Sequence, residues 1–149
     1  MKRYITLVSL LLFVLCGTRG QVAPDWYPTV TSSGVFVNHD GEEEEIEVGG
    51  SYDAPLTVTF MANPVDTAEY EVLYEWDIRQ VKNGTDRLLA KRNEEITTFT
   101  FTEGGTDVTY RVTLTITYRH RATGTEGEGE GEAITFSLRG SSVHLYNAF

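Results

Sequence analysis

Apolar and polar residues alternate with a period of two along most of the chain after about residue 29. Residues 70–78 place five large side chains on one side of an extended segment: Tyr70, Val72, Tyr74, Trp76 and Ile78. Residues 108–118 repeat this pattern with valine, tyrosine, leucine and isoleucine. Successive side chains of a β-strand point to opposite faces, so this period predicts half-buried strands. No window shows the 3.6-residue period of an amphipathic helix, and the chain is therefore predicted to be all-β.

Turn-forming sequences separate the predicted strands, namely "HDGEEEE", "VGGSYDAP", "ANPVD", "KNGT" and "TEGGTD". About seven strands with one apolar face each predict two antiparallel sheets packed face to face, as in an immunoglobulin-like β-sandwich. The segment "DRLLAKRNEE" is compatible with a short strand, a crossover or one helical turn. The Glu–Gly repeat at 124–132 predicts a flexible, self-repelling hairpin loop.

The first twenty residues have the composition of a cleaved signal peptide. Lys2 and Arg3 precede an apolar run too short to span a bilayer comfortably, and Thr18 and Gly20 are small residues at positions −3 and −1 of a cut before Gln21. The single cysteine, Cys16, leaves lipidation open as an alternative, although Leu15 is larger than a lipidation motif prefers. We therefore expect an exported protein with no membrane insertion after cleavage.

Cleavage after Gly20 leaves 129 of the 149 residues, enough for one domain with its own core. The remaining chain has no cysteine, so burial and hydrogen bonding alone must stabilise it. Three of the 12 basic residues leave with the signal, and the nine that remain face 22 acidic residues, a formal charge of −13. Such a charge repels phosphate backbones and anionic lipids, so neither nucleic acid nor a membrane surface is an expected partner.

The order of "YEWDI", "NGT" and "TTFTFTEGGTDVTYRVTLTI" resembles a PKD-type (polycystic kidney disease repeat) immunoglobulin-like domain over residues 50–140. Trp76 and Asp77 match the Trp-Asp of one family strand, and Tyr110, Val112 and Leu114 match the Tyr-x-Val-x-Leu of a later one. The resemblance implies a core that contains Trp76, Tyr110, Val112 and Leu114, with Tyr110 as a tyrosine corner. Where the family has a Gly-Asp-Gly turn after Asp77, this chain has "IRQVKNGTD". Residues 21–49 are then an N-terminal arm and a first strand.

Residues 141–149, which end in "VHLYNAF", resemble the opening of the gliding motility-associated C-terminal domain, a type B sorting domain of type IX secretion. Asn147, Ala148 and Phe149 match the family's Asn-Ala-Phe. The resemblance implies the first domain of a surface protein of the Bacteroidota, truncated at the start of its sorting domain; the alternative is a last strand. Continuation into that domain predicts display on the cell surface or secretion, and its absence predicts a periplasmic protein.

The sequence shows no constellation typical of catalysis. His39, His120 and His144 have no metal-ligand spacing, no Gly-x-Ser-x-Gly elbow is present, and the paired carboxylates fall in glycine-rich or acidic runs. We expect a protein that is not an enzyme and that has no cofactor, with calcium as the one alternative. Calcium binds six to eight oxygens, and a single loop offers four candidate ligands, Asn38, Asp40, Glu42 and Glu44, without the spacing of an EF-hand.

Two further surface features are candidates for carbohydrate. Trp26 and Tyr27 lie between Pro24 and Pro28 and could stack on a sugar ring or pin the arm onto the domain. The tripeptide Asp66–Thr67–Ala68 resembles the O-glycosylation sites of exported Bacteroidota proteins, which would place a glycan on Thr67. The expected function is a structural, adhesion or spacer module of a cell-surface protein; the alternative is a glycan- or calcium-binding module. The sequence does not identify the partner, which could be a surface protein or a glycan.

Overall fold

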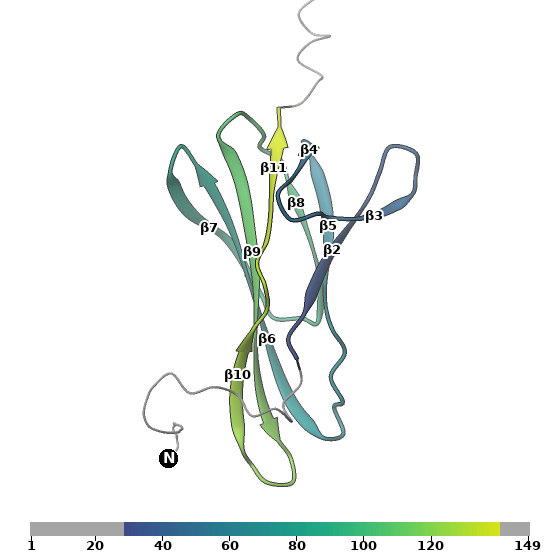
Figure 1. Cartoon of the computed structure of the whole chain (residues 1–149), viewed down its shortest axis with the longest axis vertical. Coiled ribbons are helices and arrows are strands. Elements are labelled where there is room, and N and C mark those ends of the chain that lie inside the picture. The colour runs from purple at the N-terminus through teal and green to yellow at the C-terminus, as the bar shows by residue number, and fades with distance from the viewer. Residues whose placement is uncertain (1–28, 141–149) are drawn as a thin grey trace, which may run out of the picture.

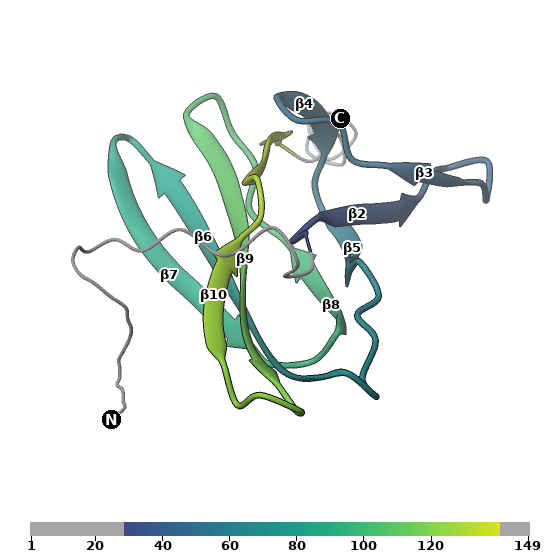
Figure 2. The same cartoon turned by 60° about the horizontal axis from the view of Figure 1, so that its bottom comes forward.

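The structure is a computed structural model that describes residues 29–140, and these residues form ten strands and no helix. The strands make two sheets that face each other as two layers (Figures 1 and 2). The described part of the chain is therefore all-β, as predicted, and its arrangement is an immunoglobulin-like sandwich. The predicted signal at 1–20, the arm residues 21–28 and the segment 141–149 lie outside the described residues.

The larger sheet has six strands in the order β4-β11-β9-β6-β7, with β10 beside β9. Its members are β4 (Gly50–Asp53), β6 (Tyr70–Lys82), β7 (Thr85–Arg92), β9 (Val108–His120), β10 (Glu126–Glu130) and β11 (Ile134–Arg139). Every pairing in this sheet is antiparallel except that of β4 with β11, which is parallel.

The smaller sheet has four antiparallel strands in the order β3-β2-β5-β8. Its members are β2 (Ser32–Val37), β3 (Glu43–Glu45), β5 (Leu56–Ala62) and β8 (Ile96–Phe101). The region predicted as an arm and first strand thus contributes β2 and β3 to the sandwich. Ten strands exceed the predicted number of about seven because β3, β4 and β10 have only three to five residues each, too few to give a clear alternation.

Strands β6 and β9 form the centre of the fold, since they pair over thirteen residues from Tyr70 opposite His120 to Lys82 opposite Val108. Their inward side chains meet those of β5, β8 and β11 in one apolar core. The four residues expected in the core, Trp76, Tyr110, Val112 and Leu114, are all buried there. The Trp76 indole packs on Phe60 with ring centroids 5.8 Å apart, and its Nε1 donates a hydrogen bond of 2.7 Å to the Glu94 carbonyl.

Tyr110 links the core to the loop between β8 and β9. Its hydroxyl donates a 2.5 Å hydrogen bond to the backbone carbonyl of Glu103, seven residues upstream, which is the contact of a tyrosine corner. The buried Gln80 amide donates to the Glu103 carboxylate at 3.0 Å and to the Tyr110 hydroxyl at 3.3 Å. Lys82 forms an ion pair with the same carboxylate. A polar network therefore fixes this loop to β6 and β9.

The turn between β6 and β7 follows directly from its sequence. Asn83 and Gly84 have φ angles of 52° and 80°, so both residues lie in the left-handed region that asparagine and glycine tolerate best. Two consecutive positive φ angles are typical of the type I′ hairpin turn, whose twist matches that of the flanking strands. Most of the segment "DRLLAKRNEE", for which three structures were open, belongs to strand β7, because the turn directs residues 85–92 back along β6.

The Glu–Gly repeat is an ordered strand, and the prediction of a flexible loop there is wrong. Strand β10 pairs with β9 from Glu126 opposite Arg119 to Glu130 opposite Thr115. Its glutamates are exposed, and the glycines between them point inward, so the repeat is itself an alternation of period two. At Gly129 there is no room for a side chain, because a Cβ there would lie 2.7 Å from both the Tyr118 hydroxyl and a Val30 methyl group.

A first prediction follows for this strand. Gly129→Ala should lower the free energy of unfolding by about 1–3 kcal/mol, because the added methyl group must displace the buried Tyr118 or Val30. Glu128→Ala, on the exposed face of the same strand, is the matched control and should change it by less than about 0.5 kcal/mol. Urea denaturation measures both values. Equal effects of the two substitutions would contradict the close approach at Gly129.

A second prediction concerns the tyrosine corner. Tyr110→Phe should lower the free energy of unfolding by about 1–2 kcal/mol, because the Glu103 carbonyl and the Gln80 amide lose a buried partner. Tyr74→Phe is the control, since the Tyr74 hydroxyl has no hydrogen bond among the described residues. Denaturation monitored by tryptophan fluorescence compares the two variants. A cost for Tyr110→Phe no greater than that for Tyr74→Phe would show that the corner contributes no stability.

Candidate functional site

Three of the four candidate calcium ligands lie in the turn between β2 and β3, the fourth, Glu44, lies on β3, and Asn38 organises this turn. Its side-chain oxygen accepts hydrogen bonds of 2.9 Å from the backbone N–H groups of Asp40 and Glu42. Its side-chain nitrogen donates to the Glu44 carboxylate at 2.5 Å. The Asn38 oxygen is therefore already occupied by two donors of its own chain, an arrangement typical of a turn.

The carboxylates of this turn do not converge. Asp40, Glu42 and Glu44 are all exposed, and within residues 29–140 no group of three or more His, Cys, Asp or Glu side chains is arranged to hold a metal ion. A calcium ion needs six to eight oxygens at 2.3–2.6 Å, so binding here would require the turn to rearrange. Calcium binding by this loop stays a prediction.

Thr67 lies in the connection between β5 and β6, where it is exposed. The preceding Asp66 accepts a 2.9 Å hydrogen bond from the Ala68 N–H through its carboxylate and another of 2.9 Å from the Tyr70 N–H through its carbonyl. Arg121 donates to the Thr67 carbonyl at 2.9 Å. Asp66 thus has a structural role in the turn that accounts for its position, and O-glycosylation of Thr67 stays a prediction.

A shallow surface depression adjoins this turn, between the β5–β6 connection and the end of β9. Its lining includes Asp66, Glu69, His120 and Arg121. The His120 Nε2 lies 3.5 Å from the Glu69 carboxylate, and the imidazole ring stands edge-on to Tyr70 with centroids 5.3 Å apart. The His120 Nδ1 contacts the backbone N–H and hydroxyl of Thr123 at 3.3 Å. Both ring nitrogens therefore have neighbours, and the depression holds no nucleophile next to a base.

The aromatic pair Trp26 and Tyr27, proposed for glycan contact, lies outside the described residues. Cys16, Gly20 and the Asn147–Ala148–Phe149 tripeptide lie outside them as well. The predictions that concern lipidation, cleavage and sorting therefore rest on the sequence alone.

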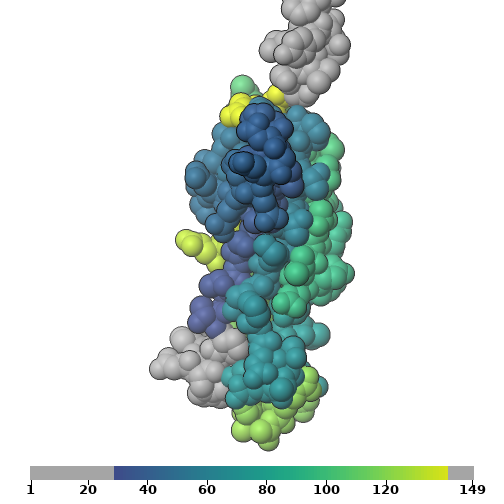
Figure 3. All heavy atoms as spheres, turned by 90° about the vertical axis from the view of Figure 1, so that its right-hand side faces the viewer, coloured from purple at the N-terminus to yellow at the C-terminus, as the bar shows by residue number. Residues whose placement is uncertain are grey.

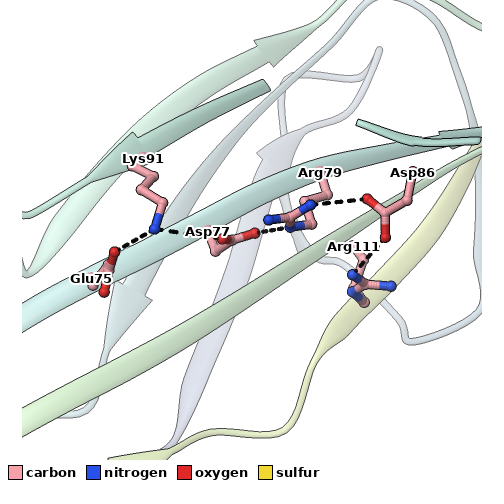
Figure 4. A network of polar contacts seen from close by, with 6 residues as sticks. All are labelled: Glu75, Asp77, Arg79, Asp86, Lys91 and Arg111. Carbon is pink, nitrogen blue, oxygen red and sulfur yellow. Dashed lines mark hydrogen bonds and ion pairs between the residues drawn. The ribbon is translucent and has the colours of Figure 1, made fainter. Parts of the chain in front are cut away.

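The outer face of the larger sheet carries a ladder of alternating charges across three strands (Figure 4). Lys91 of β7 lies 2.7 Å from the Glu75 carboxylate and 4.0 Å from that of Asp77, both on β6. Arg79 of β6 then contacts Asp77 at 2.6 Å and Asp86 of β7 at 3.3 Å. Asp86 also accepts a 3.0 Å hydrogen bond from Arg111 of β9. The ladder was not predicted from the sequence, although "YEWDIRQ" has charged residues at alternate positions and "TDRLLAKR" contains four charges.

These contacts shift the pKa of three members of the ladder, Asp86, Arg79 and Lys91. Burial alone would raise the pKa of Asp86, but hydrogen bonds from Arg79 and Arg111 outweigh it and hold that pKa below its ordinary value of 3.8. The hydrogen bond to Asp77 raises the pKa of the Arg79 guanidinium, and the hydrogen bond to Glu75 raises that of Lys91. At neutral pH the charged forms of Asp86, Arg79 and Lys91 are therefore favoured by their neighbours.

The cations of the described residues are almost all neutralised by carboxylates. Residues 29–140 contain nine lysines and arginines, and seven of them lie within 4.0 Å of an Asp or Glu oxygen: Arg79, Lys82, Lys91, Arg111, Arg119, Arg121 and Arg139. Of the other two, Arg87 donates to Gln80, and Arg92 lies over the ring of Phe99 at 5.6 Å. The surplus negative charge therefore determines the electrostatic character of the surface.

Comparison with known proteins gives no relative. No model of a protein family matches the chain, and no curated protein and no solved structure matches it. The resemblances to a PKD-type domain and to a sorting domain therefore stay predictions from the sequence. Among residues 29–140 there is also no helix long and apolar enough to cross a membrane.

A third prediction tests the ladder through its pH dependence. A carboxyl group whose pKa is lower in the folded than in the unfolded state stabilises the fold above the unfolded value, and this contribution disappears as pH falls through the folded value. Asp86→Asn should therefore lower the melting temperature at pH 7, and the difference from the unmodified protein should narrow as pH falls below 3.8. Glu128→Gln, an exposed carboxylate on β10, is the control. A difference that does not depend on pH would show that Asp86 acts by packing and not by charge.

Proposed function

We propose that the chain is a non-enzymatic spacer module of an exported cell-surface protein, a domain that bears load and presents its loops for adhesion. The observation that carries this proposal is the path of the chain through the sandwich. The carbonyls of Thr29 and Thr31 accept hydrogen bonds from Asn63, just beyond the end of β5. The carbonyl of Arg139 accepts a hydrogen bond from the N–H of Ala54, just before β5 begins.

The chain therefore enters the sandwich at one end of β5 and leaves it at the other. At a rise of about 3.3 Å per residue, the stretch between Ala54 and Asn63 separates these points by roughly 30 Å. Figure 1 shows β11 running to the top of the molecule, whereas β2 begins in its lower half. This geometry suits a module placed in series with others, because each module adds its length to the array.

The same geometry determines how tension would act on the strands. A pull between residues 29 and 140 runs along the axes of β2 and β11, and the hydrogen bonds of these strands lie across that direction. The parallel pairing of β4 with β11 and the antiparallel pairing of β9 with β11 are then loaded in shear, with all their hydrogen bonds sharing the force. A strand pulled sideways from its end would instead lose its bonds one at a time.

The sequence resemblances agree with this role. A signal peptide at 1–20 would export the chain, and a sorting domain after 141–149 would display it on the surface. The burial of Trp76, Tyr110, Val112 and Leu114 agrees with a domain that is stabilised by its core without a disulfide. The alternative functions, calcium binding at residues 38–44 and glycan binding at Trp26 and Tyr27, stay predictions, and no geometry in residues 29–140 favours them over the spacer.

A fourth prediction tests the spacer by single-molecule force measurement. Cys16 is the only cysteine, so replacing it by serine allows handles to be attached through engineered cysteine pairs. Handles at residues 29 and 140 should give a higher unfolding force than handles at residues 84 and 140 at the same loading rate. The second pair is the control, because Gly84 and Gly140 lie at the same end of the sandwich and a pull between them peels β11 from its end. A force for the first pair no higher than that for the second would contradict the load-bearing role.

A further inference from the structure

Each of the two sheets has open edges, and an open edge exposes backbone N–H and C=O groups to which another strand can bind. In the larger sheet, β7 forms one edge, and β4 and β10 share the other. In the smaller sheet, the edges are β3 and β8. Natural proteins protect such edges with charges, short strands, proline or bulges.

All edge strands but one carry such protection. Strand β7 has four charged residues and pairs with β6 through a shift of register between Ile78 and Arg79. Strand β3 consists of three glutamates, β4 has four residues, and β10 has a glutamate at every second position.

Strand β8, with the sequence "ITTFTF", has no charge, no proline and no glycine. Its register with β5 is continuous from Leu56 opposite Phe101 to Met61 opposite Ile96, so it also has no bulge. Within the described part of the chain it pairs with β5 alone. It runs along one margin of the face that Figure 3 shows, where it is coloured green.

The hydrogen bonds of β5 indicate which backbone groups of β8 point to the open side. The Ala62 N–H donates to the Glu95 carbonyl at 3.1 Å. Because bonded and non-bonded pairs alternate in an antiparallel ladder, the odd-numbered residues of β8 bond to β5. The N–H and C=O groups of Ile96, Thr98 and Thr100 are therefore directed to the open edge. These groups recur at every second residue, as in an antiparallel ladder, so a further strand can pair with them.

The side chains of β8 are held in place by β5. The hydroxyls of Thr100 and Thr57 are 2.9 Å apart, and those of Thr98 and Thr59 are 3.0 Å apart. The Ile96 side chain is 55% exposed, although it is a large apolar group. An incoming strand would therefore meet a rigid edge flanked by an uncharged face. Its ordering cost would fall on the partner and not on β8.

Charge differs between the two ends of β8. Glu94 and Glu95 directly precede the strand, are exposed and form no ion pair within residues 29–140. Glu103, beyond the other end, is ion-paired with Lys82 and accepts a hydrogen bond from Gln80. The open edge thus has an acidic end and a neutralised end, which complements a strand with a cation at one end.

We propose that β8 is a docking edge for an extended segment of another protein. That segment has about five or six uncharged residues, rich in threonine and β-branched side chains, with lysine or arginine at the end that meets Glu94 and Glu95. In an antiparallel addition, the cation lies on the C-terminal side of the segment. Backbone hydrogen bonds to Ile96, Thr98 and Thr100 supply affinity, as in other cases of strand addition. The proposal holds whether or not the domain bears load.

A second copy of this chain is a poorer occupant. Antiparallel pairing of two β8 strands would bring Glu94 and Glu95 of each copy towards Glu103 of the other, where Lys82 is already paired. Each copy also carries a formal net charge of −10. Acidic residues beside an apolar strand are a common means of preventing self-association. The two glutamates therefore select for a cationic partner.

The experiment uses two labelled synthetic peptides that share the core Thr-Val-Thr-Val-Thr and end in Lys-Lys or in Glu-Glu. Fluorescence anisotropy should show tighter binding of the Lys-Lys peptide, by roughly fivefold to tenfold, because two exposed ion pairs are gained. NMR should show shifts at the amides of Ile96, Thr98 and Thr100. Glu94→Lys combined with Glu95→Lys should reverse the preference. Binding that leaves these amides unshifted, or a preference that does not reverse, would overturn the proposal.

A backbone variant provides a second test. Thr98→Pro removes an N–H that points to the open edge and leaves the backbone hydrogen bonds between β5 and β8 in place, so it should abolish binding of the Lys-Lys peptide. Thr98→Ser keeps the N–H and should bind as the unmodified protein does. Full binding by a folded Thr98→Pro variant would contradict the proposal. Self-association that Thr98→Pro abolishes, measured by sedimentation velocity, would assign the edge to a second copy and would also overturn it.

Discussion

The thirteen-residue pairing of β6 with β9 is the interaction on which the rest of the structure depends. It places Trp76 and Ile78 beside Tyr110, Val112, Leu114 and Ile116, so that one face of two long strands supplies much of the core. With no disulfide available among residues 29–140, this burial must supply most of the favourable free energy of folding. Strands β7, β10 and β11 then attach to the two sides of this pair.

A sheet with one buried face has to make its other face compatible with water, and here charged side chains do so. The ladder of Glu75, Lys91, Asp77, Arg79 and Asp86 crosses from β6 to β7 and continues to Arg111 on β9. Individual exposed ion pairs stabilise little, but in a chain of contacts each charge has a partner of opposite sign. Most of the few lysine and arginine side chains pair with carboxylates, and the remaining carboxylates give the protein its acidic surface.

On β5 and β8, the outer face of the smaller sheet is made compatible with water without charged side chains. Threonines on β5 and β8 pair their hydroxyls across the strands, which gives an outer face that is polar but neutral. The consequence appears at the edge, because β8 ends this sheet without the charges that protect β7 and β3. The larger sheet is thus protected at its edges, whereas the smaller sheet has one edge that lacks this protection.

The sequence by itself determined the fold class and the core, because a period of two fixes which side chains share a face, and burial follows from that. Tyr110, Trp76 and the Asn83–Gly84 turn are features that the sequence determined. Their roles depend on residues close in the chain or on alternation along one strand. The Glu–Gly repeat has the same period of two, but its composition of glycine and glutamate is typical of a flexible loop, so the strand was not predicted. The absence of a side chain at Gly129 has meaning only once Tyr118 and Val30 are known to lie against it.

Tertiary structure decided what depends on which strands become neighbours. The parallel pairing of β4 with β11, the ladder between β7 and β9, and the open edge of β8 each join residues far apart in the sequence. The alternation within a strand says which face is buried but not which strand lies alongside, because every strand offers the same backbone hydrogen bonds. Only packing of the complete core selects the order of the strands, and that order leaves β8 as an unprotected edge.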